Sequence, residues 1–121
     1  FLGRDLLLVM KNEEEVVNMK PDMEKLSKLD GLITHVTARG SEYDCVARSF
    51  SPKIGIDEDP VCGLGHCYIA PYWKDKLGQN ILVSRQVSKR GGTVYCKMFK
   101  EGRVKLCGKA ALYSEAEIYV D

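Results

Sequence analysis

The run from His66 to Trp73, HCYIAPYW, carries no charged side chain, and charges return only at Lys74. A helix that is apolar on every side belongs in a protein interior, because its apolar surface would otherwise contact water. Pro71 lies past the first turn and predicts a bend, since proline removes a backbone hydrogen bond of the helix. If strands surround this helix, the fold is a sheet wrapped around a central helix.

Apolar runs on both sides of this segment predict the strands. β-branched and alternating patterns occur at residues 5–10, 31–39, 43–50, 80–88, 93–102 and 103–120. Two short helices are predicted after Asn12, a residue typical of helix caps, and between Pro21 and Gly31. The sequence therefore predicts an α+β domain with a mostly antiparallel sheet, curved or closed into a barrel around the central helix.

Length and charge limit the function. The 121 residues, 45% of them hydrophobic, are enough for one domain, residues 1–121. A formal net charge of +1 leaves no broad field to hold nucleic acid or an anionic membrane. The five cysteines are scattered and odd in number, which favours free thiols in a reducing compartment. We expect a soluble, cytoplasmic protein that binds any ligand locally.

The residues before the central helix predict an anion site. Gly63, Leu64 and Gly65 would supply the first amides of the helix, which have no partner inside it. The two glycines allow a ligand to approach the backbone closely. The helix dipole adds about half a positive charge at this end, so a carboxylate can bind without a basic side chain.

Asp59 and Cys62 lie at the same amino end of the predicted helix. Both should have their ionised forms favoured there, which would make Asp59 a proton acceptor and Cys62 a thiolate. Such groups suit proton transfer at a carbon next to a carboxylate. The alternative is structural: Asp59 would only cap the helix, Cys62 would be a small buried hydrophobe, and the glycines would only form a turn.

A metal site is the weaker interpretation of the same segment. Cys62, His66 and Cys67 are residue types that bind zinc, yet no second pair of ligands stands at a suitable spacing. We therefore expect no metal. His35 lies in the middle of a predicted strand and is interpreted as an ordinary sheet residue.

Three segments together resemble a known family. They are DEDPVCGLGHCYIAPYW (57–73), SRQVSKRGG (84–92) and GRVKLCGKAAL (102–112). They resemble the carboxyl-terminal lobe of the PhzF-like isomerases of phenazine biosynthesis, and the match runs in order over nearly the whole chain. The resemblance implies the diaminopimelate epimerase-like fold, in which two lobes each wrap a sheet around a helix and the substrate lies between the two helix ends.

The resemblance also assigns roles to residues. It implies that Asp59 contacts the substrate and that the Gly63 and Leu64 amides hold its carboxylate, with Gly65 and His66 completing the binding segment. Family members commonly have Ser at the position of Leu64 and Thr at that of Cys62. The cysteine is similar to the catalytic acid–base of diaminopimelate epimerase and related racemases, so a two-base epimerase or racemase that uses Cys62 is the alternative.

The family's principal base, a glutamate, belongs to an amino-terminal lobe that no segment here resembles. We therefore predict one lobe of an isomerase that needs no cofactor, incomplete for catalysis alone and partnered by an amino-terminal lobe or a second copy. A non-catalytic module that binds small acids or self-associates is the other alternative. Nucleic-acid binding ranks last, because the KRGG turn is short and the charges are balanced.

Overall fold

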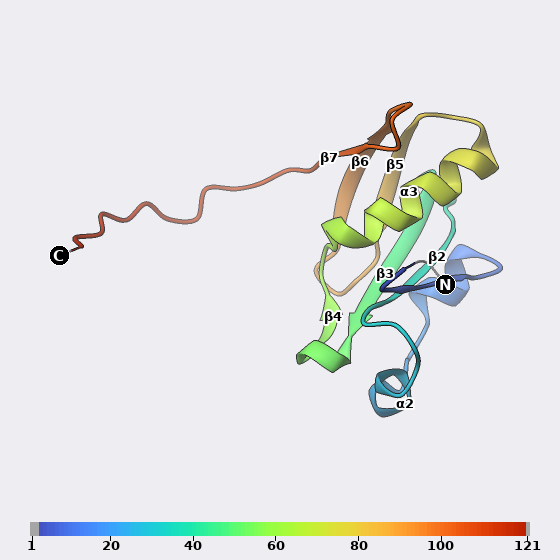
Figure 1. The fold of residues 1–121 in the computed structure, drawn as a ribbon, viewed down its shortest axis with the longest axis horizontal. Coiled ribbons are helices and arrows are strands. Elements are labelled where there is room, and N and C mark those ends of the chain that lie inside the picture. The colour runs from blue at the N-terminus through green and yellow to red at the C-terminus, as the bar shows by residue number, and fades with distance from the viewer. Residues whose placement is uncertain (1–2, 121) are drawn as a thin grey trace.

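The protein is described here by a computed structural model that covers residues 3–120. Its seven strands form one sheet in the order β1-β2-β3-β5-β6-β7, with β4 beside β3 (Figure 1). The strands are β1 (Leu6–Val9), β2 (Thr34–Arg39), β3 (Cys45–Ser51), β4 (Ile56–Asp59), β5 (Ile81–Gln86), β6 (Gly92–Met98) and β7 (Val104–Cys107). The helices are α1 (Glu13–Val17), α2 (Met23–Ser27), the 3-10 turn η1 (Pro52–Ile54) and α3 (Gly63–Leu77).

The sheet is mixed and open. β1 pairs with β2 and β3 pairs with β5 in parallel, whereas the other four pairings are antiparallel. The α+β class and the mostly antiparallel sheet predicted from the sequence are confirmed. The barrel alternative is wrong for the described residues, because the strand order runs from β1 to β7 without a pairing that joins these two ends.

Helix α3 lies across one face of the sheet (Figure 1). Its residues Ile69, Ala70 and Trp73 are buried against strand residues such as Leu82 and Cys96. The far side of the helix is not covered by the described residues, since Leu64 is 42% exposed and Cys67 is also exposed. The prediction of a helix enclosed on all sides is therefore wrong for this part of the chain, and Pro71 lies inside a helix that continues to Leu77.

Helices α1 and α2 belong to a second core of the protein. This core comprises Val16, Val36, Ala38, Val46 and Phe50, with Met19, Met23 and Leu26 packed against it. Helix α1 starts after the predicted cap Asn12, and α2 starts within the predicted range with Asp22 as its cap. The Asn12 and Asp22 side chains accept hydrogen bonds from first-turn amides at 2.9 and 3.0 Å. Each such cap is worth about 1 kcal/mol.

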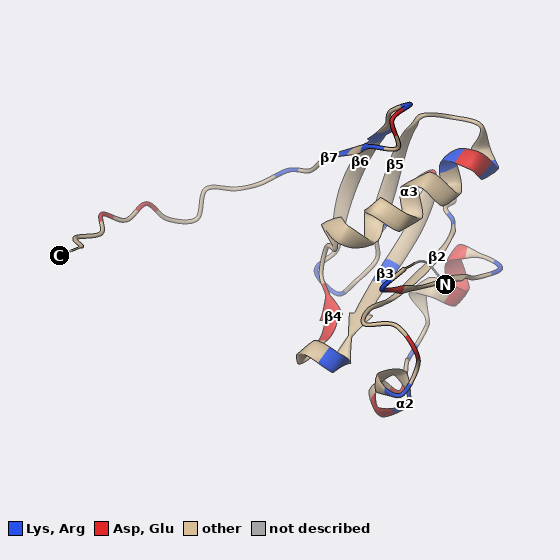
Figure 2. Cartoon of the chain, viewed as in Figure 1, with Lys and Arg blue, Asp and Glu red and all other residues tan. Residues whose placement is uncertain are grey.

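Arg48 ties this region to strand β4. Its guanidinium donates two hydrogen bonds to the Glu58 carboxylate, at 2.8 and 3.0 Å, and a third to the Met19 carbonyl at 2.7 Å. Figure 2 shows β4 as an acidic strand that leads to the uncharged first turns of α3. The acidic strand is thereby fixed beside the helix start.

The carboxyl-terminal segment leaves the sheet after Cys107. Residues 108–120 form no strand and extend away from the sheet (Figure 1). The predicted strand over 103–120 therefore ends at Cys107, because no neighbouring strand in the described part of the chain accepts the hydrogen bonds of the later residues. Five large apolar side chains of this segment are between 79% and 99% exposed: Leu112, Tyr113, Ile118, Tyr119 and Val120.

Two negative findings complete the fold. No helix among residues 3–120 has the length and apolarity needed to cross a membrane. All five cysteines are free thiols, as the sequence predicts, with Cys45, Cys62 and Cys96 buried and Cys67 and Cys107 exposed.

Candidate active site at the amino end of helix α3

A short loop joins strand β4 to helix α3 and is held by one buried side chain. Gln86 of β5 accepts a hydrogen bond from the Cys62 amide at 2.7 Å and donates one to the Asp59 carbonyl at 2.5 Å. The Asp59 carboxylate in turn accepts a hydrogen bond from the Val61 amide at 3.0 Å. The loop that carries the predicted site residues is therefore fixed at both of its ends.

The role of Gln86 was not predicted from the sequence, although a signal exists. In β5 the buried residues alternate as Leu82, Ser84 and Gln86. A side-chain amide that alternates with buried residues points into the core. It needs hydrogen-bond partners there, because an unpaired buried polar group costs free energy. This alternation points to a backbone clamp rather than a surface glutamine.

The three predicted anion-binding amides are not equivalent. The Gly65 amide donates to the Cys62 sulfur at 3.3 Å, so it is capped within the chain. The Gly63 and Leu64 amides make no hydrogen bond with any described residue, and both residues are exposed. The geometry therefore leaves two amides available to an anion, instead of three.

Cys62 occupies the position that caps the helix and is only 4% exposed. Burial raises the pKa of its thiol, the nearby Asp59 carboxylate raises it further, and the hydrogen bond from the Gly65 amide lowers it only in part. The direction of this shift is opposite to the predicted one, because burial removes the hydration that a thiolate needs and so favours the neutral thiol.

His66 is fully buried below the same turn. Its Nδ1 donates to the Cys62 carbonyl at 2.7 Å, and its Nε2 accepts from the Ser84 hydroxyl at 2.9 Å. Burial lowers the pKa of the ring, which is therefore neutral near pH 7. Both ring nitrogens have partners inside the protein, so His66 supports the helix start and does not face a ligand.

The zinc alternative gains no support from the geometry. Among residues 3–120 no three His, Cys, Asp or Glu side chains lie together as a metal site requires. Cys67, one of the three residues considered, is exposed, whereas Cys62 and His66 are buried.

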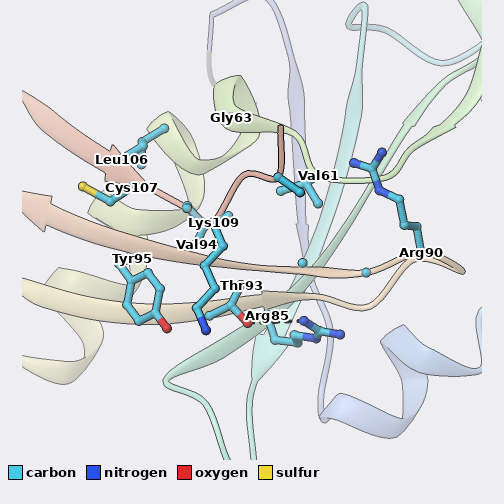
Figure 3. A pocket seen from close by; sticks show the side chains of 14 residues that line it. Val61, Gly63, Arg85, Arg90, Thr93, Val94, Tyr95, Leu106, Cys107 and Lys109 are labelled. Atoms are coloured by element: carbon cyan, nitrogen blue, oxygen red, sulfur yellow. Dashed lines mark hydrogen bonds between the residues drawn. The ribbon is translucent and has the colours of Figure 1, made fainter. Parts of the chain in front are cut away.

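A hollow of about 870 Å³ opens beside the helix start (Figure 3). Val61 and Gly63 line its helix side, and the remainder is lined by residues of β5, β6 and β7, of the β5–β6 turn and of the segment 108–111 that follows β7. Its cationic side chains are Arg85, Arg90 and Lys109. Of the predicted site residues only Gly63 lines this hollow, and Asp59, the last residue of β4, does not line it.

The RGG turn (90–92) supports the same loop. Gly91 has a φ of 69°, which favours glycine, and a side chain on it would come 2.7 Å from an Arg85 nitrogen. A Cβ atom on Gly92 would overlap the Val61 side chain. Both glycines are therefore needed for the β5–β6 hairpin to pack against the start of α3.

Solved structures place this fold in a defined class. A crystal structure from Clostridium difficile, described as a phenazine biosynthesis PhzC/PhzF protein, has a TM-score of 0.89 and 43% sequence identity over 97% of this chain. The structure of a PhzF-family phenazine biosynthesis protein from Enterococcus faecalis has a TM-score of 0.81 and 44% identity over 93% of this chain. The fold is that of the PhzF-like α+β proteins.

The sequence comparisons give the family directly. The family model described as phenazine biosynthesis-like protein, PhzC-PhzF, matches residues 3–116. An uncharacterised isomerase of Pseudomonas aeruginosa is 41% identical over 113 residues, which cover 93% of this chain and 43% of the relative. The mouse phenazine biosynthesis-like domain-containing protein 2 is 36% identical over 104 residues, which cover 81% of this chain and 35% of the relative. The chain belongs to the PhzF-like isomerase family, as the sequence resemblance indicated.

The chain spans less than half the length of these relatives. It corresponds to 43% of the Pseudomonas protein and 45% of the Clostridium chain. The activity of the whole protein is therefore a matter of proposal.

Proposed function

We propose that this chain forms one lobe of an isomerase that moves a proton within a small carboxylate substrate, without a cofactor. The proposal is carried by one observation: the exposed Gly63 and Leu64 amides have no partner among the described residues and lie one short loop away from Asp59. Amides at a helix start bind anions well. A carboxylate held there would place its neighbouring carbon near the Asp59 side chain.

In this proposal each residue has a separate task. The two amides hold the substrate carboxylate and stabilise the negative charge that develops when a proton leaves the adjacent carbon. Asp59 takes up or returns a proton. The main base comes from a second lobe. The family resemblance supports this, and so does the fact that this chain spans less than half the length of its relatives.

The carboxyl-terminal segment favours an assembly with such a second lobe. Its apolar side chains from Leu112 to Val120 are exposed in the chain alone. An exposed apolar segment of this kind is typical of an interaction site, and its unpaired backbone can add to the edge of another sheet. The uncovered side of α3 at Leu64 and Cys67 adds to the apolar surface that an amino-terminal lobe would cover.

The experiment is proton exchange in deuterated water. The two-lobe protein is incubated with a panel of small amino and hydroxy acids, and incorporation of deuterium at carbon is followed by NMR. Asp59→Asn should slow exchange by about 10²-fold or more, the usual contribution of a general acid–base group. Asp57→Asn, an exposed acid of the same strand, is the matched control and should leave the rate unchanged.

Three outcomes would each count against the proposal. No exchange with any acid of the panel would remove the isomerase function. Loss of exchange on Cys62→Ser with normal exchange in Asp59→Asn would instead support the two-base racemase alternative. A chain that forms a stable homodimer in sedimentation, with no affinity for the second lobe, would favour the self-associating module.

A further inference from the structure

A group of polar side chains on the sheet face opposite α3 has no part in the function proposed above. Arg85 of β5 and Thr93 of β6 are paired directly across the two strands. Tyr95 follows Thr93 at the two-residue spacing that returns a side chain to the same face of a sheet. Val94, which lies between them in the chain, is buried in the core against α3. Arg85, Thr93 and Tyr95 therefore point to the other face.

This part of the sheet face is open. Helices α1 and α2 cover the neighbouring part, where the buried strand residues of the second core come from β2 and β3. One of them, Val46, is paired with Arg85, so the second core ends beside Arg85. Neither helix contributes a residue to the lining of the hollow, and Tyr95 is 43% exposed. A ligand can therefore reach the polar side chains.

The Arg85 guanidinium is held in a fixed orientation at the wall of the hollow. Its Nη1 donates a hydrogen bond to the Thr93 hydroxyl oxygen at 3.2 Å. Its Nη2 lies against the β5–β6 turn, since a Cβ atom on Gly91 would come 2.7 Å from it. Such a side chain loses little conformational entropy when it binds an anion, because it is already ordered.

Lys109 reaches the same place from the segment that follows β7. It lines the hollow together with Arg85, and Figure 3 shows its side chain directed toward Thr93. Within residues 3–120 neither Arg85 nor Lys109 forms an ion pair, and no Asp or Glu lines the hollow. The third cation, Arg90, lies apart from these two in Figure 3. Two positive charges thus share one site without a carboxylate partner from the described chain.

Two hydroxyl groups complete the polar set. The Thr93 oxygen accepts a hydrogen bond from Arg85, so its own proton is left for another acceptor. The Tyr95 hydroxyl, which also lines the hollow, makes no hydrogen bond with any residue that the structure describes. The site therefore offers a guanidinium, an ammonium and two hydroxyls as donors, a set that matches an oxyanion.

Charge and volume select the class of oxyanion. A carboxylate carries one negative charge, whereas a phosphate monoester carries close to two near pH 7, because its second pKa is about 6. Two unpaired cations match the phosphate monoester. The hollow measures about 870 Å³, which is within the usual range of small-molecule sites. A phosphate group alone would leave most of this space empty, so the ligand should have an organic part.

We propose that the hollow binds a phosphate monoester of a small organic molecule. Arg85 binds two phosphate oxygens through its planar fork, and Lys109 neutralises the second charge. The Thr93 and Tyr95 hydroxyls donate to the remaining oxygen positions, and the organic part occupies the rest of the hollow. The site uses neither Asp59 nor the amides at the start of α3, so it does not depend on the isomerase function.

The first test locates the ligand. Phenyl phosphate is titrated into the full chain labelled with ¹⁵N, and the backbone amide shifts are followed in ¹H–¹⁵N spectra at pH 7.5. Saturable shifts should centre on Gly91, Thr93 and Lys109. Saturable shifts centred instead on Gly63 and Leu64 would show that the anion binds at the helix start, and they would refute this proposal while supporting the proposed anion site there. The absence of any saturable shift would refute it as well.

The second test uses charge variants. Arg85→Gln should raise the Kd for phenyl phosphate about tenfold or more, because charged hydrogen bonds are lost. Lys109→Gln should raise it roughly threefold, since one more exposed charge is removed. Arg103→Gln is the matched control, because Arg103 is exposed and does not line the hollow, and it should change the Kd by less than about twofold.

The variants also separate a specific site from a response to net charge. Equal losses of affinity in Arg103→Gln and Arg85→Gln would show that only the total charge matters, which contradicts a site at Arg85. Lys109 belongs to no helix or strand and is exposed, so Lys109→Gln remains informative if Arg85→Gln does not fold. An unchanged Kd in Lys109→Gln would contradict the pairing of two cations on one phosphate.

The third test compares three anions on the wild-type chain. Benzoate has the same ring as phenyl phosphate with a single charge, and inorganic phosphate has the charge without the ring. Each should bind about tenfold more weakly than phenyl phosphate, because each lacks one of the two features that the hollow matches. Benzoate binding as tightly as phenyl phosphate would contradict recognition of a dianion. Inorganic phosphate binding as tightly would contradict recognition of an ester and leave only a site for free phosphate.

Discussion

Gly65→Ala should destabilise the protein, although the same change usually stabilises a helix. Alanine is favoured over glycine by up to about 1 kcal/mol inside a helix. Here the new Cβ would lie 2.7 Å from His35 Nδ1 and 2.9 Å from its Cε1. The ring cannot move aside, because its two nitrogens are hydrogen-bonded and it is stacked on Tyr68, with the ring centres 5.8 Å apart.

The magnitude follows from three contributions. Overpacking a buried site costs about 1–3 kcal/mol. Displacement of His35 from Ser49 leaves buried polar groups unpaired, at about 1–3 kcal/mol. After the gain in helix propensity is subtracted, we expect the free energy of unfolding to fall by roughly 2–4 kcal/mol.

Gly63→Ala is the matched control in the same turn. Its Cβ would meet only a Leu106 methyl group at 4.0 Å, so this change should be neutral or stabilising by up to about 1 kcal/mol. Urea denaturation of both variants at pH 7, followed by circular dichroism, measures the difference. Equal stability of the two variants would refute the reasoning, and so would an undiminished cost of Gly65→Ala in a His35→Ala background.

Three further predictions concern the same scaffold. Gln86→Met should lower the free energy of unfolding by roughly 2–4 kcal/mol in urea denaturation, since it leaves two buried backbone groups unpaired at about 1–3 kcal/mol each; a loss below about 0.5 kcal/mol would contradict the clamp. The free energy of unfolding should fall as the pH is lowered from about 7 to 5, because burial lowers the pKa of His35 and His66 and the unfolded chain then binds more protons than the folded one. A free energy of unfolding that does not change over this pH range would contradict the prediction. Arg48→Lys should lower the free energy of unfolding by about 1–3 kcal/mol, because lysine cannot make the paired contact with Glu58 or keep the hydrogen bond to the α1 region. A melting temperature equal to that of the wild type would contradict this prediction.

Local patterns predicted the elements well, because they depend on nearby residues. The cap at Asn12, the helix entry at Pro21 and the apolar patterns of the strands are such patterns, and the structure has the corresponding elements. The last strand was predicted too long for the same reason. Alternation from residue 103 to 120 shows that the segment can form a strand, but strand formation also needs a neighbour, and the described residues supply one only as far as Cys107.

The structure places the residues of the predicted site near one another, while their functional roles stay predictions. The acidic loop, the glycines and the helix start lie together as the sequence indicated. The predicted direction of the pKa shift of Cys62 is opposite to the one in the structure, since the sequence reveals the helix dipole but not the burial that raises the pKa of the thiol. His35 was interpreted as an ordinary strand residue, because its partners Asp5 and Ser49 lie 30 and 14 positions away in the chain.

The clamp made by Gln86 has a consequence for affinity. It belongs to a strand of the sheet, yet it holds both ends of the loop that carries Asp59 and the first turn of α3. The proposed anion site would thus be preorganised by the sheet, and a ligand that bound there would not have to order the loop. Binding energy that would otherwise be lost to conformational entropy remains available for recognition.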